Sequence, residues 1–163
     1  MTARIQTKAT PLVLAAAAML SVLVGVQPAA ADPNGQYIVN KYDTNIVVDV
    51  SGGRPVAGQW AIAYAKNGGD NQKWSVHDYA NGLAYQVGPG VVLARNSSTG
   101  FVESQFDSGQ PGQRWWMAGS SSSGFVYLHS RDGNDCLTNV GTGSQLITAR
   151  CRQGDPRQLW AFR

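Results

Sequence analysis

The sequence predicts an all-β protein made of three similar units. The first observation is a repeated Gln-x-Trp tripeptide, whose three copies have their tryptophans 41 and 45 residues apart. Repeats with periods in this range are typical of supersecondary units that bury one shared core. The second observation is that short apolar, aromatic and β-branched runs alternate with Gly, Asn, Asp, Ser and Pro, without helical periodicity of useful length. The copies are Gln72-Lys73-Trp74, Gln113-Arg114-Trp115 and Gln158-Leu159-Trp160.

Four short strands are expected in each unit. Those of the first unit are placed at residues 37–41, 46–50, 60–65 and 73–77, and those of the second at 83–87, 91–94, 102–106 and 114–118. Those of the third are placed at 125–129, 136–139, 145–150 and 159–162, after a flexible hairpin tip of four serines at 120–123. Three four-stranded blades are too few to close a propeller, which typically has four to eight. Twelve strands in three equivalent arms therefore predict a β-trefoil, a six-stranded barrel capped by three hairpins.

The Gln-x-Trp copies are interpreted as the framework of this core. We expect the three indoles to fill the centre of the barrel. Their glutamine partners stand two residues earlier, on the same side of a strand, and we expect the amides to bond to backbone groups. The repeated tripeptide therefore predicts mainly a structural role.

Residues 1–31 are interpreted as a secretory signal peptide and not as part of the fold. Arg4 and Lys8 form a positive flank, residues 11–26 form an apolar run, and Ala29 to Ala31 offer a small-residue cleavage site. A membrane anchor is the alternative, but the run is short for a span. The expected mature protein is one secreted domain at 32–163, with repeats at about 35–78, 79–119 and 120–163. We expect no membrane insertion after cleavage.

The charge of the mature chain argues against one class of partner. Without Arg4 and Lys8 the basic residues number 11 against 10 acidic ones, so the net charge is +1 and not the +3 of the whole chain. A nucleic-acid-binding protein normally carries a basic stripe, and none is visible here. We therefore expect no nucleic acid partner.

The two cysteines, Cys136 and Cys151, lie 15 residues apart in the third unit. In an exported protein such a pair is best interpreted as a disulfide. A loop of this length would contribute about 3 kcal/mol to stability. Two thiols alone cannot make a zinc site, so a structural bond is favoured over metal or redox chemistry.

The third unit also carries a family resemblance. It reads Cys136-Leu137-Thr138-Asn139-Val140, then 143–147, then Cys151, then the last Gln-x-Trp, and this order resembles the ricin B-chain type lectin repeat. The same frame fits the first unit, where Val47 and Lys66 replace the cysteines, and fits the second unit loosely. The resemblance covers essentially the whole mature chain and implies a β-trefoil that binds carbohydrate.

The resemblance implies one shallow sugar site per unit, and the first unit matches it best. There Asp49 would accept hydrogen bonds from two adjacent hydroxyls, and Tyr64 would stack on the apolar face of the sugar ring. Asn71 and Gln72 would add polar contacts. These four residues form the predicted carbohydrate site.

Two features of the first unit leave other interpretations open. Ile62 stands where the family often has a polar Gln, and Trp60, two residues earlier, is an alternative platform. Asp49 could instead cap the turn that follows it. Gln72 is interpreted chiefly as a structural hydrogen-bonding residue, with any sugar contact secondary.

The other two units match the pattern less well. In the second unit, Ala94 stands where the Asp is wanted and Gly112 where the Asn is wanted. In the third unit, Thr138 replaces the Asp, Ala149 takes the aromatic position and Arg157 replaces the Asn. We therefore expect ligand recognition mainly in the first unit.

These observations predict a secreted lectin for galactose- or xylose-type glycans. Catalysis has little support, because no Gly-x-Ser-x-Gly, HExxH or phosphate-cradling motif is present and nothing places Glu103 opposite an Asp. We expect no enzyme activity, no cofactor and no metal. The alternative is a trefoil that has lost sugar binding and acts as a protein-interaction or inhibitor module. The sequence leaves the oligomeric state open.

Overall fold

The computed structural model describes residues 35–119 and 124–163. The predicted signal peptide at 1–31 and the predicted hairpin tip at 120–123 lie outside the described residues. The described residues form twelve β-strands and three short 3-10 turns, and no α-helix. No helix long and apolar enough to cross a bilayer is therefore found in this part of the chain.

The strands follow one another in three sets of four. The first set is β1 (Ile38–Asn40), β2 (Ile46–Val50), β3 (Ala61–Ala65) and β4 (Ser75–Tyr79). The second set is β5 (Gly82–Gly88), β6 (Val91–Arg95), β7 (Val102–Phe106) and β8 (Trp115–Ala118). The third set is β9 (Val126–Ser130), β10 (Cys136–Thr138), β11 (Ile147–Ala149) and β12 (Leu159–Phe162). Before the last strand of each set lies a 3-10 turn: η1 (Asp70–Gln72), η2 (Pro111–Gln113) and η3 (Pro156–Gln158).

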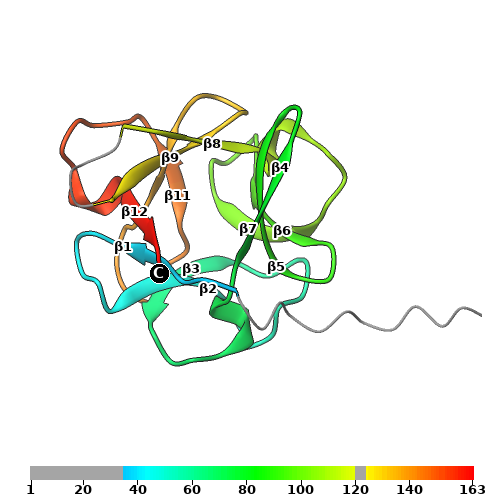
Figure 1. Ribbon diagram of the computed structural model, residues 1–163, viewed down its shortest axis with the longest axis horizontal. Helices are drawn as coiled ribbons and strands as arrows, with labels where there is room; N and C mark the ends of the chain where they lie inside the picture. Colours follow the sequence, from blue (N-terminus) through cyan, green and yellow to red (C-terminus); the bar gives the residue numbers. More distant parts are fainter. Residues whose placement is uncertain (1–34, 120–123) are drawn as a thin grey trace, which may run out of the picture.

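Six of the strands form a closed barrel. Antiparallel pairs join β1 to β12, β12 to β9, β9 to β8, β8 to β5 and β5 to β4. The ring closes where Gln36 and Trp74 exchange backbone hydrogen bonds of 2.8 and 2.9 Å just outside β1 and β4. Closure leaves no free sheet edge in the barrel. The predicted β-trefoil is confirmed, and Figure 1 shows its three lobes around a common centre.

Three hairpins form the rest of the trefoil. They are β2–β3, β6–β7 and β10–β11. Neighbouring hairpins meet through single antiparallel bridges, which join Trp60 to Glu103, Ile62 to Gln145, and Phe101 to Ile147. The outer face of one unit is therefore continuous with the outer face of the next.

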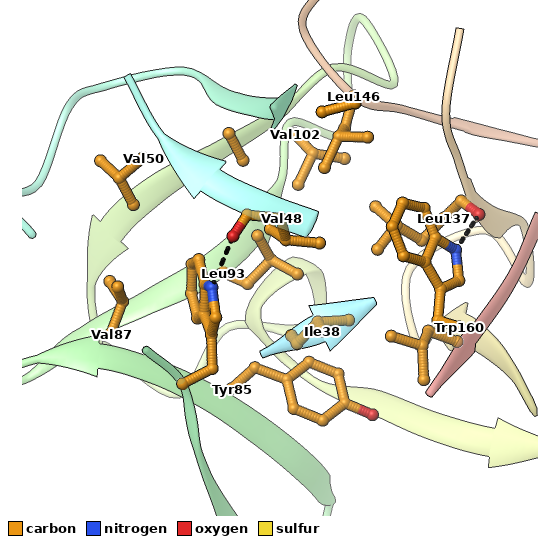
Figure 2. Close-up of a cluster of buried hydrophobic side chains, with 14 of the residues drawn as sticks. Ile38, Val48, Val50, Tyr85, Val87, Leu93, Val102, Leu137, Leu146 and Trp160 are labelled. Atoms are coloured by element: carbon orange, nitrogen blue, oxygen red, sulfur yellow. Dashed lines mark hydrogen bonds between the residues drawn. The ribbon is translucent and has the colours of Figure 1, made fainter. Parts of the chain in front are cut away.

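The core is built around the repeated tryptophans, which are fully buried. Each indole Nε1 donates to a carbonyl oxygen in the second strand of its own set, and Figure 2 shows this bond between Trp160 and Leu137. A buried indole N–H needs such an acceptor, because an unpaired donor in the core would be costly. The three bonds are Trp74 to Val48 at 3.0 Å, Trp115 to Leu93 at 3.0 Å and Trp160 to Leu137 at 2.9 Å.

The repeated glutamines bond the end of each hairpin to the 3-10 turn. In every unit the amide oxygen accepts from the backbone N–H of a residue five or six positions earlier, and the amide nitrogen donates to a backbone carbonyl at the end of the hairpin; we call this arrangement the glutamine brace. The braces join Gln72 to Asn67 N and Ala65 O, Gln113 to Ser108 N and Phe106 O, and Gln158 to Arg152 N and Arg150 O, at 2.7–3.1 Å. The expected position on a strand was wrong, because each glutamine ends a 3-10 turn.

The disulfide between Cys136 and Cys151 is present, with the two Cα atoms 5.1 Å apart. It ties the first residue of β10 to the segment that follows β11. His129 lies beside it, with Nδ1 3.4 Å from Cys151 Sγ. The imidazole also stacks on Trp116, with ring centroids 5.3 Å apart. Because the sulfurs are bonded to each other, this His–Cys group offers no thiolate to a metal.

Candidate functional site

An open hollow of about 280 Å³ lies on the outer face of the first unit. Three of the four predicted site residues line it: Asp49, Tyr64 and Asn71. The remainder of the wall is formed by Gly52, Gly53, Ile62 and Asn67. The structure therefore brings the predicted carboxylate, ring and amide to one place.

Strand alternation explains why these side chains meet. In the β2–β3 pair, Asp49 lies opposite Ile62. Val48 and Val50, on either side of Asp49, face the core and are fully buried. Residues two apart on β3 share a face, so Tyr64 lies on the same side as Ile62 and Asp49, and 43% of its surface is exposed.

Two glycines form part of the turn that follows β2. Gly52 and Gly53 have φ values of +85° and +74°, in the left-handed region that other residues avoid. These glycines allow the turn that follows β2, and both of them line the hollow. The predicted turn is present, and it forms part of the wall.

Gln72 lies behind Asp49 and not at the surface. It is fully buried, and its Nε2 donates to Asp49 Oδ2 at 2.8 Å as well as to the backbone of the brace. The amide therefore holds the carboxylate in place, and any influence on a ligand passes through Asp49. Asn71, which is also buried, is fixed by donating from Nδ2 to Val50 O at 2.9 Å.

Burial is the main influence on the protonation of Asp49. It raises the pKa of this carboxyl above its ordinary value of 3.8, because the charged form loses hydration. Hydrogen bonds from Gln72 and Asn71 favour the charged form and lower the pKa, but they offset only part of the effect of burial. The site therefore holds a carboxylate that takes up a proton more readily than an exposed Asp does.

The second unit has a larger hollow of about 450 Å³ but a different lining. Ala94 and Gln105 take the places of Asp49 and Tyr64, and Gln105 Oε1 accepts from Gln113 Nε2 at 3.2 Å. Arg95 and Asp132, which form an ion pair of 2.7 Å, also line the hollow. Sequence reasoning missed this pair because the partners are 37 residues apart and belong to different units.

Gly112, where the family pattern has Asn, has a packing reason of its own. A Cβ atom at this position would lie 2.5 Å from the backbone oxygen of Arg95. No side chain fits there unless the backbone moves. The departure in the second unit therefore reflects a close approach of two chain segments, which the sequence pattern does not reveal.

The third unit uses its corresponding polar group internally. Thr138, in the place of Asp49, accepts from Gln158 Nε2 at 3.0 Å and donates to the carbonyl of Cys136 at 2.9 Å. Arg157 lies over the ring of Tyr42, with 4.7 Å between the guanidinium carbon and the ring centroid. The adjacent hollow has a volume of only about 60 Å³. Asn139 is buried and donates to Asn40 Oδ1 at 3.1 Å.

A family model described as the ricin-type beta-trefoil lectin domain matches residues 33–160. A search of curated proteins by sequence found no match.

Solved structures show the same fold at low identity. The designed threefold-symmetric protein ThreeFoil is 24% identical, with a TM-score of 0.69 and coverage of 79% of this chain and 97% of that one. The C-terminal half of an earthworm R-type lectin, solved with GalNAc, is 19% identical, with a TM-score of 0.59 and coverage of 80% and 100%. An exo-β-1,3-galactanase from Clostridium thermocellum is 20% identical, with a TM-score of 0.69, and the match covers 82% of this chain but only 30% of the enzyme.

Proposed function

Because the chain belongs to the ricin-type β-trefoil lectin domain family, we propose that it binds galactose- or xylose-type glycans mainly through its first unit. Family membership supports carbohydrate binding in general. The first unit is chosen because Asp49, Tyr64 and Asn71 line one hollow on its surface. Among the described residues, the equivalent positions of the other units hold Ala94 with Gln105, and Thr138 with Ala149.

The proposed recognition divides the sugar into a polar edge and an apolar face. The carboxylate of Asp49 accepts hydrogen bonds from two adjacent hydroxyls, and charged acceptors make the stronger bonds. Gln72 orients the carboxylate from behind through the 2.8 Å bond. The exposed ring of Tyr64 packs against the C–H face of the sugar, and Asn71 adds a polar contact from the wall of the hollow.

The choice of galactose- or xylose-type sugars is based on the family resemblance and on one similar solved structure. The earthworm lectin half was solved with GalNAc, a galactose-type sugar, which favours that class. Because the hollow is open and shallow, we expect millimolar to high-micromolar affinity for single sugars, roughly 4–6 kcal/mol. Repeated glycans or self-association would raise the apparent affinity through multivalency.

A glycan array followed by titration calorimetry tests this proposal. The wild type is compared with Asp49→Asn, which keeps the shape and an acceptor for Gln72 but removes the charge. Asp70→Asn is the matched control, because Asp70 is an exposed residue of the neighbouring turn η1 and does not line the hollow. We expect Asp49→Asn to lose at least about tenfold in affinity, or 1.4 kcal/mol, and the control to bind normally.

Other outcomes separate the alternatives. Unchanged glycan binding by Asp49→Asn would refute the placement of the site in the first unit. If no galactose, lactose or xylan is retained and the protein instead captures a protein partner, the interaction-module hypothesis is favoured. Hydrolysis of nitrophenyl galactosides or xylosides by the pure protein would contradict the prediction that it is not an enzyme.

We also propose that the protein is secreted. The pattern of residues 1–31 supports this proposal, and so does the disulfide, because such bonds persist in oxidising compartments. Mass spectrometry of the protein from the culture medium should find Asp32 as the first residue. Intact protein retained in the cell with its first 31 residues attached would contradict the proposal.

A further inference from the structure

The exposed face of β3 continues well beyond the hollow. Ala61 and Ala63 point inward and are fully buried, whereas the alternate positions Trp60, Ile62 and Tyr64 point outward. Trp60 is 59% exposed, although the tryptophans of the repeats are completely covered. A large apolar ring left in solvent beside a hollow is a feature that binding sites use.

The backbone around Trp60 is well anchored. Its carbonyl accepts from the backbone N–H of Ser51 at 2.9 Å, and on its other side it forms the antiparallel bridge to Glu103 of β7. The backbone that holds the indole is therefore fixed by contacts with both the first and the second unit. Trp60 and Tyr64 are four residues apart, or about 13 Å along an extended strand, so one sugar ring does not cover both. Ile62 lies between them and lines the hollow.

A second oriented carboxylate accompanies this second ring. Glu103 is half-buried on the same outer face, directly across the bridge from Trp60. Its Oε1 accepts from Gln105 Nε2 at 2.6 Å, much as Asp49 accepts from Gln72. Gln105 is in turn held by Gln113 of the second brace. The pairing of an exposed ring with an amide-held carboxylate thus occurs twice along one continuous surface.

We propose that Trp60 and Glu103 form a second sugar subsite continuous with the Asp49 hollow, so that the ligand is a linear glycan chain and not a single sugar. This inference rests on the proposed function of the first unit. One residue of the chain occupies the hollow, the chain crosses Ile62, and a later residue stacks on Trp60 while its hydroxyls donate to Glu103. Two carboxylates beside two rings suit a neutral chain rich in hydroxyl donors.

The test is the dependence of affinity on chain length. Calorimetric titrations use xylose, xylobiose and xylotriose, and in parallel galactose with its β-linked dimer and trimer. For the wild type we expect the trimer to bind at least about tenfold more tightly than the monomer, which corresponds to 1.4 kcal/mol. In Trp60→Ala the ratio of trimer to monomer affinity should fall toward one, and in Glu103→Gln it should fall by a smaller factor.

Phe101→Ala is the matched control. Phe101 precedes β7 as Trp60 precedes β3, and it is also exposed, but its bridge partner is Ile147 of the third unit and not a residue of the first unit. This variant should keep the wild-type ratio. Thermal unfolding of all three variants verifies that they are folded, and Glu103→Gln tests the subsite without removing apolar area.

The failures of the two proposals are distinguishable. If monomers bind and Asp49→Asn abolishes binding, but the wild type gains nothing with chain length, the first-unit site stands and the second subsite is refuted. If the wild type dimerises and Trp60→Ala makes it monomeric without changing the affinity ratio, the surface joins two copies of the chain, and the subsite is again refuted. If no glycan binds, both proposals fail.

Discussion

The first and third units contain the same glutamine brace but use it for different purposes. In the first unit the remaining bond of Gln72 goes to the carboxylate of Asp49, which lines an open hollow. In the third unit the equivalent bond of Gln158 goes to Thr138, whose hydroxyl is bonded inside the unit. In each unit the brace joins the hairpin to the 3-10 turn, whether or not the unit has a candidate sugar site. The comparison shows that the brace glutamine is hydrogen-bonded to the site residue in the first unit and to an internal hydroxyl in the third.

The largest expected effect tests what the units share. Trp115→Ala should lower the free energy of unfolding by about 3–5 kcal/mol, because it removes a fully buried indole from the common core. Trp160→Ala should cost a similar amount, and urea denaturation measures both. A loss below about 1 kcal/mol in either variant would show that the units do not depend on one core.

The next effect tests what distinguishes the third unit. The double variant Cys136→Ser, Cys151→Ser should lose about 3 kcal/mol, because a 15-residue loop is no longer closed in the unfolded chain. Thermal unfolding of the wild type with and without reductant provides the comparison. Equal stability in both conditions would contradict a structural role for the disulfide.

A smaller loss of stability is expected when the glycine at position 112 of the second unit is replaced. Gly112→Ala should cost about 1–3 kcal/mol, because the new Cβ would meet the backbone oxygen of Arg95. Ser98→Ala, an exposed position in the wall of the same hollow, is the control and should unfold like the wild type. Full stability of Gly112→Ala would contradict this steric reason for the glycine.

The smallest effect on stability concerns the protonation of Asp49, and it has opposite signs for folding and binding. Because the folded pKa is raised, the contribution of Asp49 to stability is present below its ordinary value of 3.8 and is lost as pH rises through the folded value. Glycan binding needs the charged acceptor, so it should fall on acidification with a midpoint above pH 3.8. Titrations from pH 7 to 4 measure this, with Asp49→Asn expected to show no such transition.

Much of the fold was predictable because its signals are local. Trp74, Trp115 and Trp160 recur with the period of a supersecondary unit, and strand alternation places Asp49 and Tyr64 on one face. The pairing of Cys136 with Cys151 needed no geometry, since there are only two cysteines. Strand ends were less predictable, because 3-10 turns occupy the residues just before the final strand of each unit.

Three of the four predicted site residues line one hollow of the first unit, but their contacts were only partly predictable. Gln72 was interpreted chiefly as a structural residue with a secondary sugar contact, and the structure shows it buried behind Asp49 and bonded to its carboxylate. The space denied to Gly112 depends on a close approach of two segments of the second unit, and the ion pair of Arg95 with Asp132 depends on a contact between units. The bridge from Trp60 to Glu103 has the same origin. No short sequence window contains both partners of such a contact.

The sequence by itself determined the repeat, the alternating faces and the residue types available for a ligand, because a strand repeats every two residues and a trefoil unit every forty or so. Only the tertiary structure decided which of those residues face solvent and which neighbours they meet. The physical reason is barrel closure: it brings distant hairpins to one surface, and the space left between them determines whether a polar side chain is free for a ligand or bonded within the protein.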